Sequence, residues 1–193
     1  MRKAKVATIE EVKLIAETLD AESHKRGNEL FTDVADVWRI GFYTARRVSD
    51  IIGMKWEDVK DGVWTLTEQK TGKVIHLPLP EKMLAILNNR RGNNDGWVFQ
   101  SRRHRNKHIS RQAVENALLR VREVLKARGE LPDGCYSMHS TRKASATIVY
   151  RQTKDVLKAM KFLNHSKPET TLKYLELNDA VDDALAITSG YSL

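Results

Sequence analysis

Four separate stretches of the sequence carry side chains that can bind a phosphate group or transfer a proton. They are "TARRVSD", "QKTGK", "HSTRK" and "LNHSKPETTLKY". The strongest candidates in them, in chain order, are Arg46 and Arg47, Lys70 and Lys73, His139 and Arg142, and His165 and Tyr174. Arginine presents a planar fork of donors that matches phosphate oxygens, and histidine can move a proton near neutral pH. A tyrosine phenol becomes a nucleophile when neighbouring positive charges favour its deprotonation. The combination points to chemistry on a phosphodiester.

No single stretch establishes that chemistry. His139 and Arg142 are three positions apart, which places them on one face of a helix, but solvated helix faces show the same pattern. Tyr174 lies near Leu172 and Leu175, and tyrosines often pack at helix edges with the hydroxyl in water. Each of these two stretches, taken alone, is more typical of a structural role.

The composition favours a nucleic-acid partner. The chain has 193 residues, a hydrophobic fraction of 41% that can build a core, and a formal net charge of +8 that suits a polyanion. Its single cysteine, Cys135, excludes an intramolecular disulfide and fits a reducing compartment. No apolar run approaches the roughly 18 residues that a membrane span needs. We therefore expect a cytosolic protein with no membrane partner.

A basic run at residues 101–111, "SRRHRNKHISR", contains five Lys or Arg residues and no acid. It is expected in a loop that leads into a helix, where it favours contacts with phosphates. A solvated loop would have the same composition, so both interpretations stay open. His104 and His108 are four positions apart in this run, and a DNA-contacting or solvated role is favoured over a metal site. The chain has no HExxH, no CxxC and no cluster of carboxylates, so we expect no metal.

The hydrophobic periodicity predicts a mainly helical protein. Thr8 and Glu11 have the spacing of a capping box ahead of a helix over about residues 9–22. A second helix is expected to end near Tyr43, and a short one in "RRVSDIIGMKW" to stop at Gly53. The β-rich runs "GVWTLTEQ" and "KVIHLPLP" flank "KTG" and predict a hairpin. Further helices are expected at about 81–89, 110–128, 140–151, 153–162 and, with Pro168 in its first turn, 168–176. The predicted class is mainly α with a small antiparallel β-sheet (α+β).

The order of the four stretches resembles that of the tyrosine recombinase (phage integrase) family, in its catalytic domain. "TARRVSDIIGMKWEDV" resembles the family's T-G-L-R-x-S-E-L-x-x-L-x-W-x-D-[IV] segment, and "QKTGKVIHLPLP" resembles its lysine-bearing hairpin. "HSTRKASAT" is similar to the H-x-L-R-[RH]-x-x-A-T box, and "FLNHSKPETTLKYL" to the L-G-H-x-x-x-x-T-x-x-x-Y box. The resemblance covers residues 8–178. The sequence departs from these patterns at Ala45 and Asn164, where glycine is usual, and at Arg46 and Thr141, where leucine is usual.

The resemblance implies a role for each matching residue. The implied catalytic residues, the last of them the nucleophile, are Arg47, Lys70, His139, Arg142, His165 and Tyr174. Asp50 matches an acid that orients the site. A surface ion pair between Arg47 and Asp50 is the alternative, but both residues match the family pattern. Lys73 competes with Lys70 for the role of the lysine. The residues expected to contact DNA are Arg46, Lys73, Arg102, Arg103, Arg105, Lys107, Arg111 and Lys143.

The implied reaction cleaves and rejoins DNA strands through a covalent 3′-phosphotyrosyl intermediate and leaves a free 5′-hydroxyl. Such a reaction needs no cofactor and no ATP, and it would serve site-specific integration, excision or inversion. Three alternatives stay open. They are a type IB topoisomerase-like enzyme, a DNA-binding protein that has lost cleavage, and a metal-free nuclease that uses His139 and His165 as acid and base.

The resemblance also implies a domain organisation and partners. Residues 1–178 would form the catalytic domain, and the amphipathic tail at 179–193 would be exchanged between protomers. The first expected helix begins close to Met1, so no N-terminal core-binding domain is expected within these residues. Two explanations stay open, removal of such a domain and a single-domain recombinase. The expected partners are double-stranded recombination sites, further copies in a homotetramer on paired sites, and accessory DNA-bending proteins. Without DNA we expect a monomer, associated with the nucleoid in the cytoplasm and encoded by a bacterium or phage.

Overall fold

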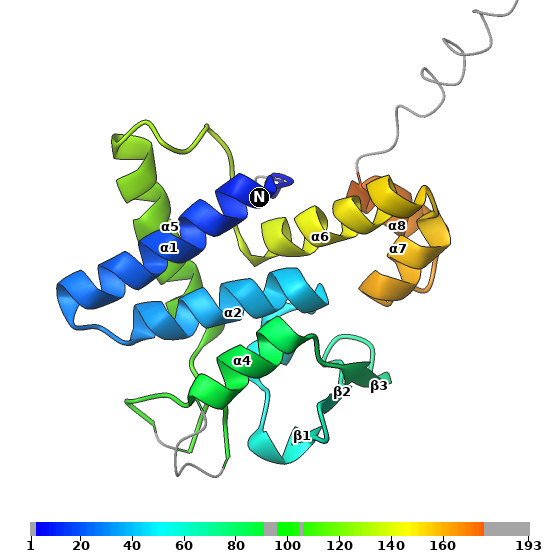
Figure 1. Ribbon diagram of the computed structural model, residues 1–193, viewed down its shortest axis with the longest axis horizontal. Coiled ribbons are helices and arrows are strands. Elements are labelled where there is room, and N and C mark those ends of the chain that lie inside the picture. Colours follow the sequence, from blue (N-terminus) through cyan, green and yellow to red (C-terminus); the bar gives the residue numbers. More distant parts are fainter. Residues whose placement is uncertain (1–2, 91–95, 105, 176–193) are drawn as a thin grey trace, which may run out of the picture. The chain divides into compact units, whose positions relative to one another are not determined.

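The computed structural model describes residues 3–90, 96–104 and 106–175 (Figure 1). The chain divides into two compact units, the first ending at Ala144 and the second beginning at Ser145. This boundary falls inside helix α6 (Met138–Thr153). The described residues are mostly helical and include a small three-stranded antiparallel sheet, which confirms the predicted fold class.

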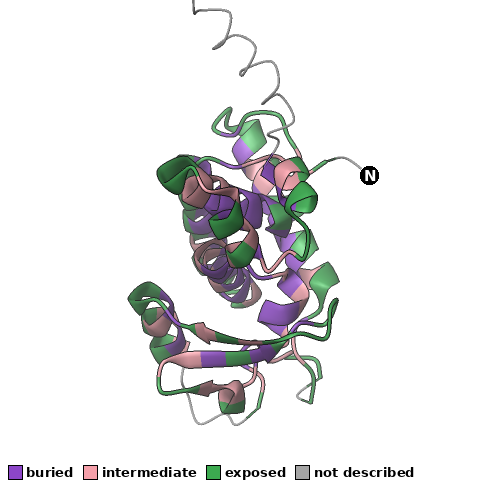
Figure 2. Ribbon diagram, turned by 90° about the vertical axis from the view of Figure 1, so that its right-hand side faces the viewer, coloured by how far each residue is buried: buried purple, intermediate pink, exposed green. Residues whose placement is uncertain are grey.

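Three helices build the main core of the first unit. Helix α1 (Ile9–Arg26) packs against α2 (Leu30–Thr44), and α5 (Arg111–Ala127) packs against both. Buried residues gather where these helices meet (Figure 2), among them Trp38, whose indole Nε1–H donates to the carbonyl of Val12 at 3.0 Å. An apolar core of this kind drives folding because it removes a large nonpolar area from water.

The predicted capping box begins α1. The Thr8 hydroxyl accepts from the Glu11 backbone N–H at 3.1 Å, and the Glu11 carboxylate accepts from the Thr8 N–H at 2.8 Å. The helix continues beyond the predicted end at residue 22 and stops at Gly27, which has a positive φ of 55°. The sequence therefore located the start of this helix more accurately than its end.

The sheet contains the predicted hairpin and one further strand. Strands β2 (Val63–Thr67) and β3 (Val74–Pro78) are antiparallel, as expected. Strand β1 (Val59–Lys60) pairs with β2 through a two-residue turn at Asp61 and Gly62, both of which have positive φ. Asp-Gly favours this kind of turn because its twist matches that of the flanking strands. The dipeptide was the signal for β1, which was not predicted.

Short elements connect the helical core of the first unit to its sheet. Helix α3 (Val48–Ile52) ends at Gly53, as predicted, and is followed by the 3-10 helix η1 (Trp56–Asp58). After the sheet, α4 (Glu81–Arg90) packs against α2 and buries Met83.

The second unit contains the later part of α6, then α7 (Val156–Leu163) and α8 (Pro168–Leu175). Asp155 caps α7 by accepting from the N–H of Leu157 at 2.8 Å. Helices α7 and α8 pack together. Pro168 begins α8, as predicted, because proline has no N–H to lose in a first helical turn.

The later predicted helices correspond to α4 to α8, with ends that differ by a few residues. The predicted amphipathic tail at 179–193 lies outside the described residues. Within the described ranges, no helix is both long enough and apolar enough to cross a bilayer.

Candidate active site

A tight turn between α2 and α3 carries Arg46 and Arg47. Helix α2 ends at Thr44, Ala45 adopts a left-handed conformation with φ 50°, and Arg47 is the extended N-cap residue of α3. Glycine adopts left-handed backbone at least cost, which explains why it is usual at this place in the family pattern. Ala45 takes the left-handed conformation with a Cβ present, so the departure from the pattern does not remove the turn.

The carboxylate of Glu68 lies beside both arginines of this turn. Glu68 Oε1 is 3.0 Å from Arg47 Nη1 and 3.6 Å from Arg46 Nη1, and the Glu68 side chain is fully buried. The shorter contact is an ion pair, not an aligned hydrogen bond. The alternative interpretation, a surface ion pair between Arg47 and Asp50, is therefore wrong about the partner of Arg47.

Glu68 was missed by the sequence reasoning, although a signal for it exists. Trp64 and Leu66 alternate as the buried positions of β2, and Glu68 continues the same alternation two residues later. Side chains at i, i+2 and i+4 of a strand share one face, so Glu68 had to point toward the protein interior. A charged residue at such a position needs a partner of opposite charge.

Asp50 ties α3 to the hairpin that carries the candidate lysine. It is buried, and its Oδ1 accepts from the backbone N–H of Gln69 at 3.0 Å, while the Gln69 amide donates to the carbonyl of Ser49 at 3.3 Å. Lys70 follows Gln69 directly and is exposed in the turn between β2 and β3. Asp50 thus fixes the backbone next to Lys70. Lys73 is also exposed, on the far side of the same turn.

The N-terminal part of α6 brings Arg142 to the turn between α2 and α3. The Arg142 side chain is buried and Nη1 donates to the carbonyl of Ala45, a residue 97 positions away in the chain. Since Ala45 lies two residues before Arg47, this contact brings together two of the sequence-predicted boxes. His139 lies one turn earlier on α6 and is exposed.

Positive charge surrounds His139. Partial desolvation of its ring, followed by the charges of Arg142, Arg111, Arg47 and Lys143, lowers the pKa of His139 below its ordinary value. The ring is therefore neutral at pH 7, with one nitrogen that donates and one that accepts. The charges of Arg47 and Arg142 both lower the pKa of His139, so the two guanidinium groups lie in the same region of the first unit.

Gly41 allows the close approach of α2 to the start of α6. A Cβ at this position would lie 2.7 Å from Met138 Cε and 2.9 Å from Thr141 Oγ1. The Thr141 hydroxyl cannot easily turn away, because it donates to the carbonyl of Met138 at 2.9 Å. Threonine at 141, where leucine is usual in the box, thus packs against α2 and is hydrogen-bonded within α6.

We expect Gly41→Ala to destabilise the protein by about 1–3 kcal/mol, because overpacking a tight contact forces the helices apart. Chemical denaturation followed by circular dichroism would measure this change. Met138→Ala removes the nearer of the two atoms, so Gly41→Ala should cost clearly less in that background than in the wild type. An equal cost in both backgrounds would show that crowding against Met138 is not the cause of the destabilisation.

The second unit places His165 and Tyr174 in contact. Their rings meet edge to face, with centroids 5.4 Å apart and planes at 89°. His165 Nδ1 lies 3.1 Å from the hydroxyl of Thr171, which is fully buried. The box pattern places a threonine at Thr170, but the hydroxyl that contacts His165 belongs to the next residue. Tyr174 is half-buried, with its ring packed and part of its surface accessible.

Asn164 is the second departure from glycine and also adopts left-handed backbone. Its φ is 53°, and it ends α7 with its N–H directed to the carbonyl of Lys161 at 3.0 Å. Asparagine tolerates this conformation better than most residues. Ala45 and Asn164, the two residues at positions where glycine is usual, thus both have the positive φ that glycine adopts most easily. The next residue, His165, is thereby presented just beyond the helix end.

The residues expected to contact DNA have different environments. Arg46 is buried and its Nε–H donates to the carbonyl of Thr44 at 3.0 Å, and Lys143 is buried and donates to the carbonyl of Ala4 at 2.9 Å. This burial argues against the direct phosphate contacts that were predicted for these two residues. Exposed positions are occupied by Lys73, Arg102, Arg103, Lys107 and Arg111. Arg105 lies outside the described residues.

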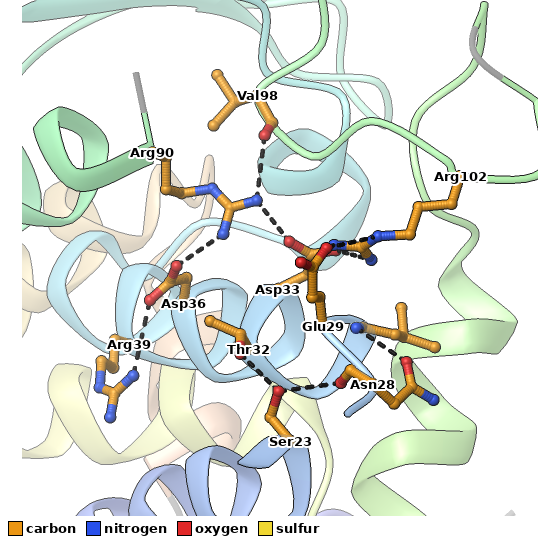
Figure 3. Close-up of polar contacts among 11 residues, drawn as sticks. Ser23, Asn28, Glu29, Thr32, Asp33, Asp36, Arg39, Arg90, Val98 and Arg102 are labelled. Carbon is orange, nitrogen blue, oxygen red and sulfur yellow. Dashed lines mark hydrogen bonds and ion pairs between the residues drawn. The ribbon is translucent and has the colours of Figure 1, made fainter. Parts of the chain in front are cut away.

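Arg102 is held by an acid at the N-cap of α2 and an acid in its first turn (Figure 3). It contacts Glu29 Oε2 at 2.6 Å and Asp33 Oδ2 at 2.9 Å, and Asp33 also pairs with Arg90 at 2.5 Å. Arg90 donates to Asp36 at 2.8 Å as well. This network fastens the beginning of the basic run to α2 and to the end of α4.

Comparisons with known proteins agree with the geometry. The sequence pattern of the phage integrase family matches residues 5–180. A probable integrase/recombinase of Bacillus subtilis (strain 168), YoeC, is 32% identical over 145 residues, which cover 72% of this chain and 75% of that protein.

Solved structures share the fold at lower identity. A lambda integrase dimer bound to a COC′ core site is 22% identical with a TM-score of 0.70, and the match covers 91% of this chain and 48% of that one. XerA recombinase is 17% identical with a TM-score of 0.66, over 97% of this chain and 64% of that one. The chain therefore spans about half the length of the lambda integrase chain. The family pattern covers almost all of the sequence and the Bacillus relative matches most of both chains, so this chain belongs to the phage integrase family of tyrosine recombinases.

Proposed function

We propose that this chain is the catalytic part of a site-specific DNA recombinase that cleaves and rejoins strands through a covalent 3′-phosphotyrosyl intermediate. The observation that carries the proposal is the meeting of two arginines from distant boxes. Arg142 on α6 donates to the carbonyl of Ala45, two residues before Arg47, and both guanidinium groups act on His139. Family membership supports the same function.

The proposed chemistry begins with the charge of the phosphodiester. In-line attack increases the negative charge on the non-bridging oxygens, and Arg47 and Arg142 would meet it with charge-assisted hydrogen bonds. His139 and His165 would donate to the same oxygens. Preorganised donors of this kind are typically worth on the order of 3–4 kcal/mol of the barrier each.

Tyr174 would supply the nucleophile. Its phenol gives up its proton to solvent water, the phenolate oxygen forms a bond to phosphorus, and the bond from phosphorus to the 5′-oxygen breaks. Lys70, exposed in the hairpin turn, would give a proton to the leaving 5′-oxygen. Attack by a 5′-hydroxyl on the phosphotyrosine reverses these steps and rejoins a strand. The bond energy stays in the intermediate, so the proposed reaction needs no ATP, and the two arginines would supply the positive charge that a metal ion supplies in other phosphoryl-transfer enzymes.

The partners follow from the same proposal. The chain would act on double-stranded recombination sites as a homotetramer on paired sites and would be a monomer without DNA. The name of one similar structure describes a lambda integrase tetramer bound to a Holliday junction. We propose the same kind of assembly here, with residues 1–178 as the catalytic domain, residues 179–193 exchanged between protomers, and accessory DNA-bending proteins on the sites.

Covalent trapping tests the proposal without knowledge of the target site. The protein is incubated in EDTA with a library of short duplexes that have a random central sequence and a nick, so that cleavage releases a short strand and cannot be reversed. We expect a protein–DNA adduct that survives SDS, and sequencing of the attached strands would identify the preferred site. Absence of any adduct across the library would overturn the proposal. Relaxation of supercoiled plasmid without strand exchange at that site would favour the topoisomerase-like alternative.

A further inference from the structure

Glu68 is a buried acid shared by two arginines. Its carboxylate is fully buried, Arg46 is about as buried, and the Arg47 side chain keeps 18% of its surface exposed. Glu68 Oε1 lies between the two guanidinium groups, at 3.0 Å from Arg47 and 3.6 Å from Arg46. Burial strengthens such contacts, because little water is present to screen them.

Arg46 stands where the family pattern has leucine, so the charge balance of this turn differs from that pattern. With leucine at this position, the Glu68 carboxylate would face Arg47 alone and would cancel its charge. With Arg46 present, two arginines instead of one face Glu68 and the nearby Asp50. Desolvation lowers the pKa of Arg46 and the nearby Glu68 and Asp50 oppose that change. A guanidinium remains protonated under any physiological condition, so Arg46 keeps its positive charge beside Glu68.

Glu68 also organises the turn that carries Lys70. Its Oε2 accepts from the Thr71 hydroxyl at 2.7 Å, and its backbone carbonyl accepts from Gly72 N–H at 2.8 Å. Its own N–H donates to the carbonyl of Lys73 at 2.9 Å. One residue therefore contacts the candidate first arginine at one carboxylate oxygen and the candidate lysine turn at the other.

We propose that Glu68 is a positioning residue for DNA cleavage, which orients Arg47 and the Lys70 turn, and that Arg46 offsets its negative charge. This inference rests on the proposed function for its effect on cleavage. Asp50, the acid that the family resemblance indicated, instead holds the backbone of Gln69. Both acids thus support the hairpin turn, and Glu68 in addition contacts Arg47.

Three variants separate positioning from stability. Glu68→Gln leaves buried Arg46 beside a neutral amide, and Arg46→Leu leaves Glu68 with one arginine, so each single change should lower the denaturation midpoint. The double variant Arg46→Leu/Glu68→Gln removes both charges, and its midpoint should return close to that of the wild type, because replacing a buried ion pair costs less than breaking it. The stability and cleavage of the double variant can therefore be compared directly.

The cleavage rate of the double variant decides the role of Glu68. On a suicide duplex with saturating protein, we expect its single-turnover rate to fall about tenfold while its DNA affinity changes little. Asp36→Asn is the matched control, since it also changes a carboxylate to an amide in an ion network but lies about 12 Å along α2 from the turn. It should lower stability without slowing cleavage by folded protein. Wild-type cleavage by the stable double variant would overturn the proposal.

A second measurement keeps this inference separate from the proposed function. Hindered rotation of the Arg47 guanidinium can be followed by nitrogen-15 NMR without DNA, with the Arg47 signal assigned by its loss in Arg47→Lys. We expect restricted rotation in the wild type and faster rotation in the double variant. Equal rotation in the two proteins would overturn the positioning role, whether or not the wild type forms a covalent adduct. A missing adduct with restricted Arg47 would instead count against the recombinase proposal alone.

Discussion

Tyr174→Phe should abolish the covalent protein–DNA adduct, with a loss of at least about 10⁴-fold in its rate of formation, because the variant lacks the attacking oxygen. The fold should survive the change. Tyr174 is half-buried and its ring packs edge to face on His165, and a phenyl ring keeps that contact. DNA affinity should also change little, since the arginines of the first unit are untouched. The measurement is SDS gel electrophoresis of the protein with a labelled suicide duplex, in EDTA.

Tyr150→Phe is the matched control for this prediction. Tyr150 lies on α6 in the same unit, is partly exposed and has no matching box. Its variant should form the adduct at the wild-type rate. An adduct that persists in Tyr174→Phe would show that another residue is the nucleophile. If the wild type and the Tyr174→Phe variant both break strands and neither forms an adduct, the nuclease alternative with His139 and His165 would be favoured.

Arg142→Lys should slow cleavage by about 10²–10³-fold, although it keeps the positive charge. Arginine contacts two phosphate oxygens at once with a rigid fork, and a lysine ammonium cannot reproduce that geometry. The loss corresponds to about 3–4 kcal/mol of transition-state stabilisation, the usual effect of removing one preorganised donor. Single-turnover cleavage at saturating protein would measure it, because weak binding then does not contribute.

Stability must be measured alongside this rate, because Arg142 also supports the fold. Its side chain is buried and donates to the carbonyl of Ala45, so Arg142→Ala would leave that carbonyl without this donor. Arg128→Lys is a suitable control, since Arg128 is exposed and pairs only loosely with Glu130, at 3.9 Å. A folded Arg142→Lys protein that cleaves within about threefold of the wild type would contradict the proposed role.

The sequence alone determined the elements and the family. Capping residues, periodic apolar positions and the hairpin turn act over a few residues, so Thr8 with Glu11, Gly53 and Pro168 marked helix ends correctly. The boxes with Arg47, Arg142 and Tyr174 follow one another in the family's order, and order along the chain is a property of the sequence. Family membership was therefore predicted before any distance was known, and the comparisons confirm it.

The tertiary structure decided which neighbours these residues have. Arg46 and Lys143 read as basic DNA contacts, yet both are buried, because burial depends on what packs over a residue and not on its own charge. Glu68 is an ordinary acid in the sequence, and only the tertiary structure brings this residue, which follows β2, to the turn that carries Arg47. The contact of Arg142 with Ala45 joins positions 97 residues apart. Such contacts arise from helix and strand packing over the whole first unit, and no local pattern encodes them.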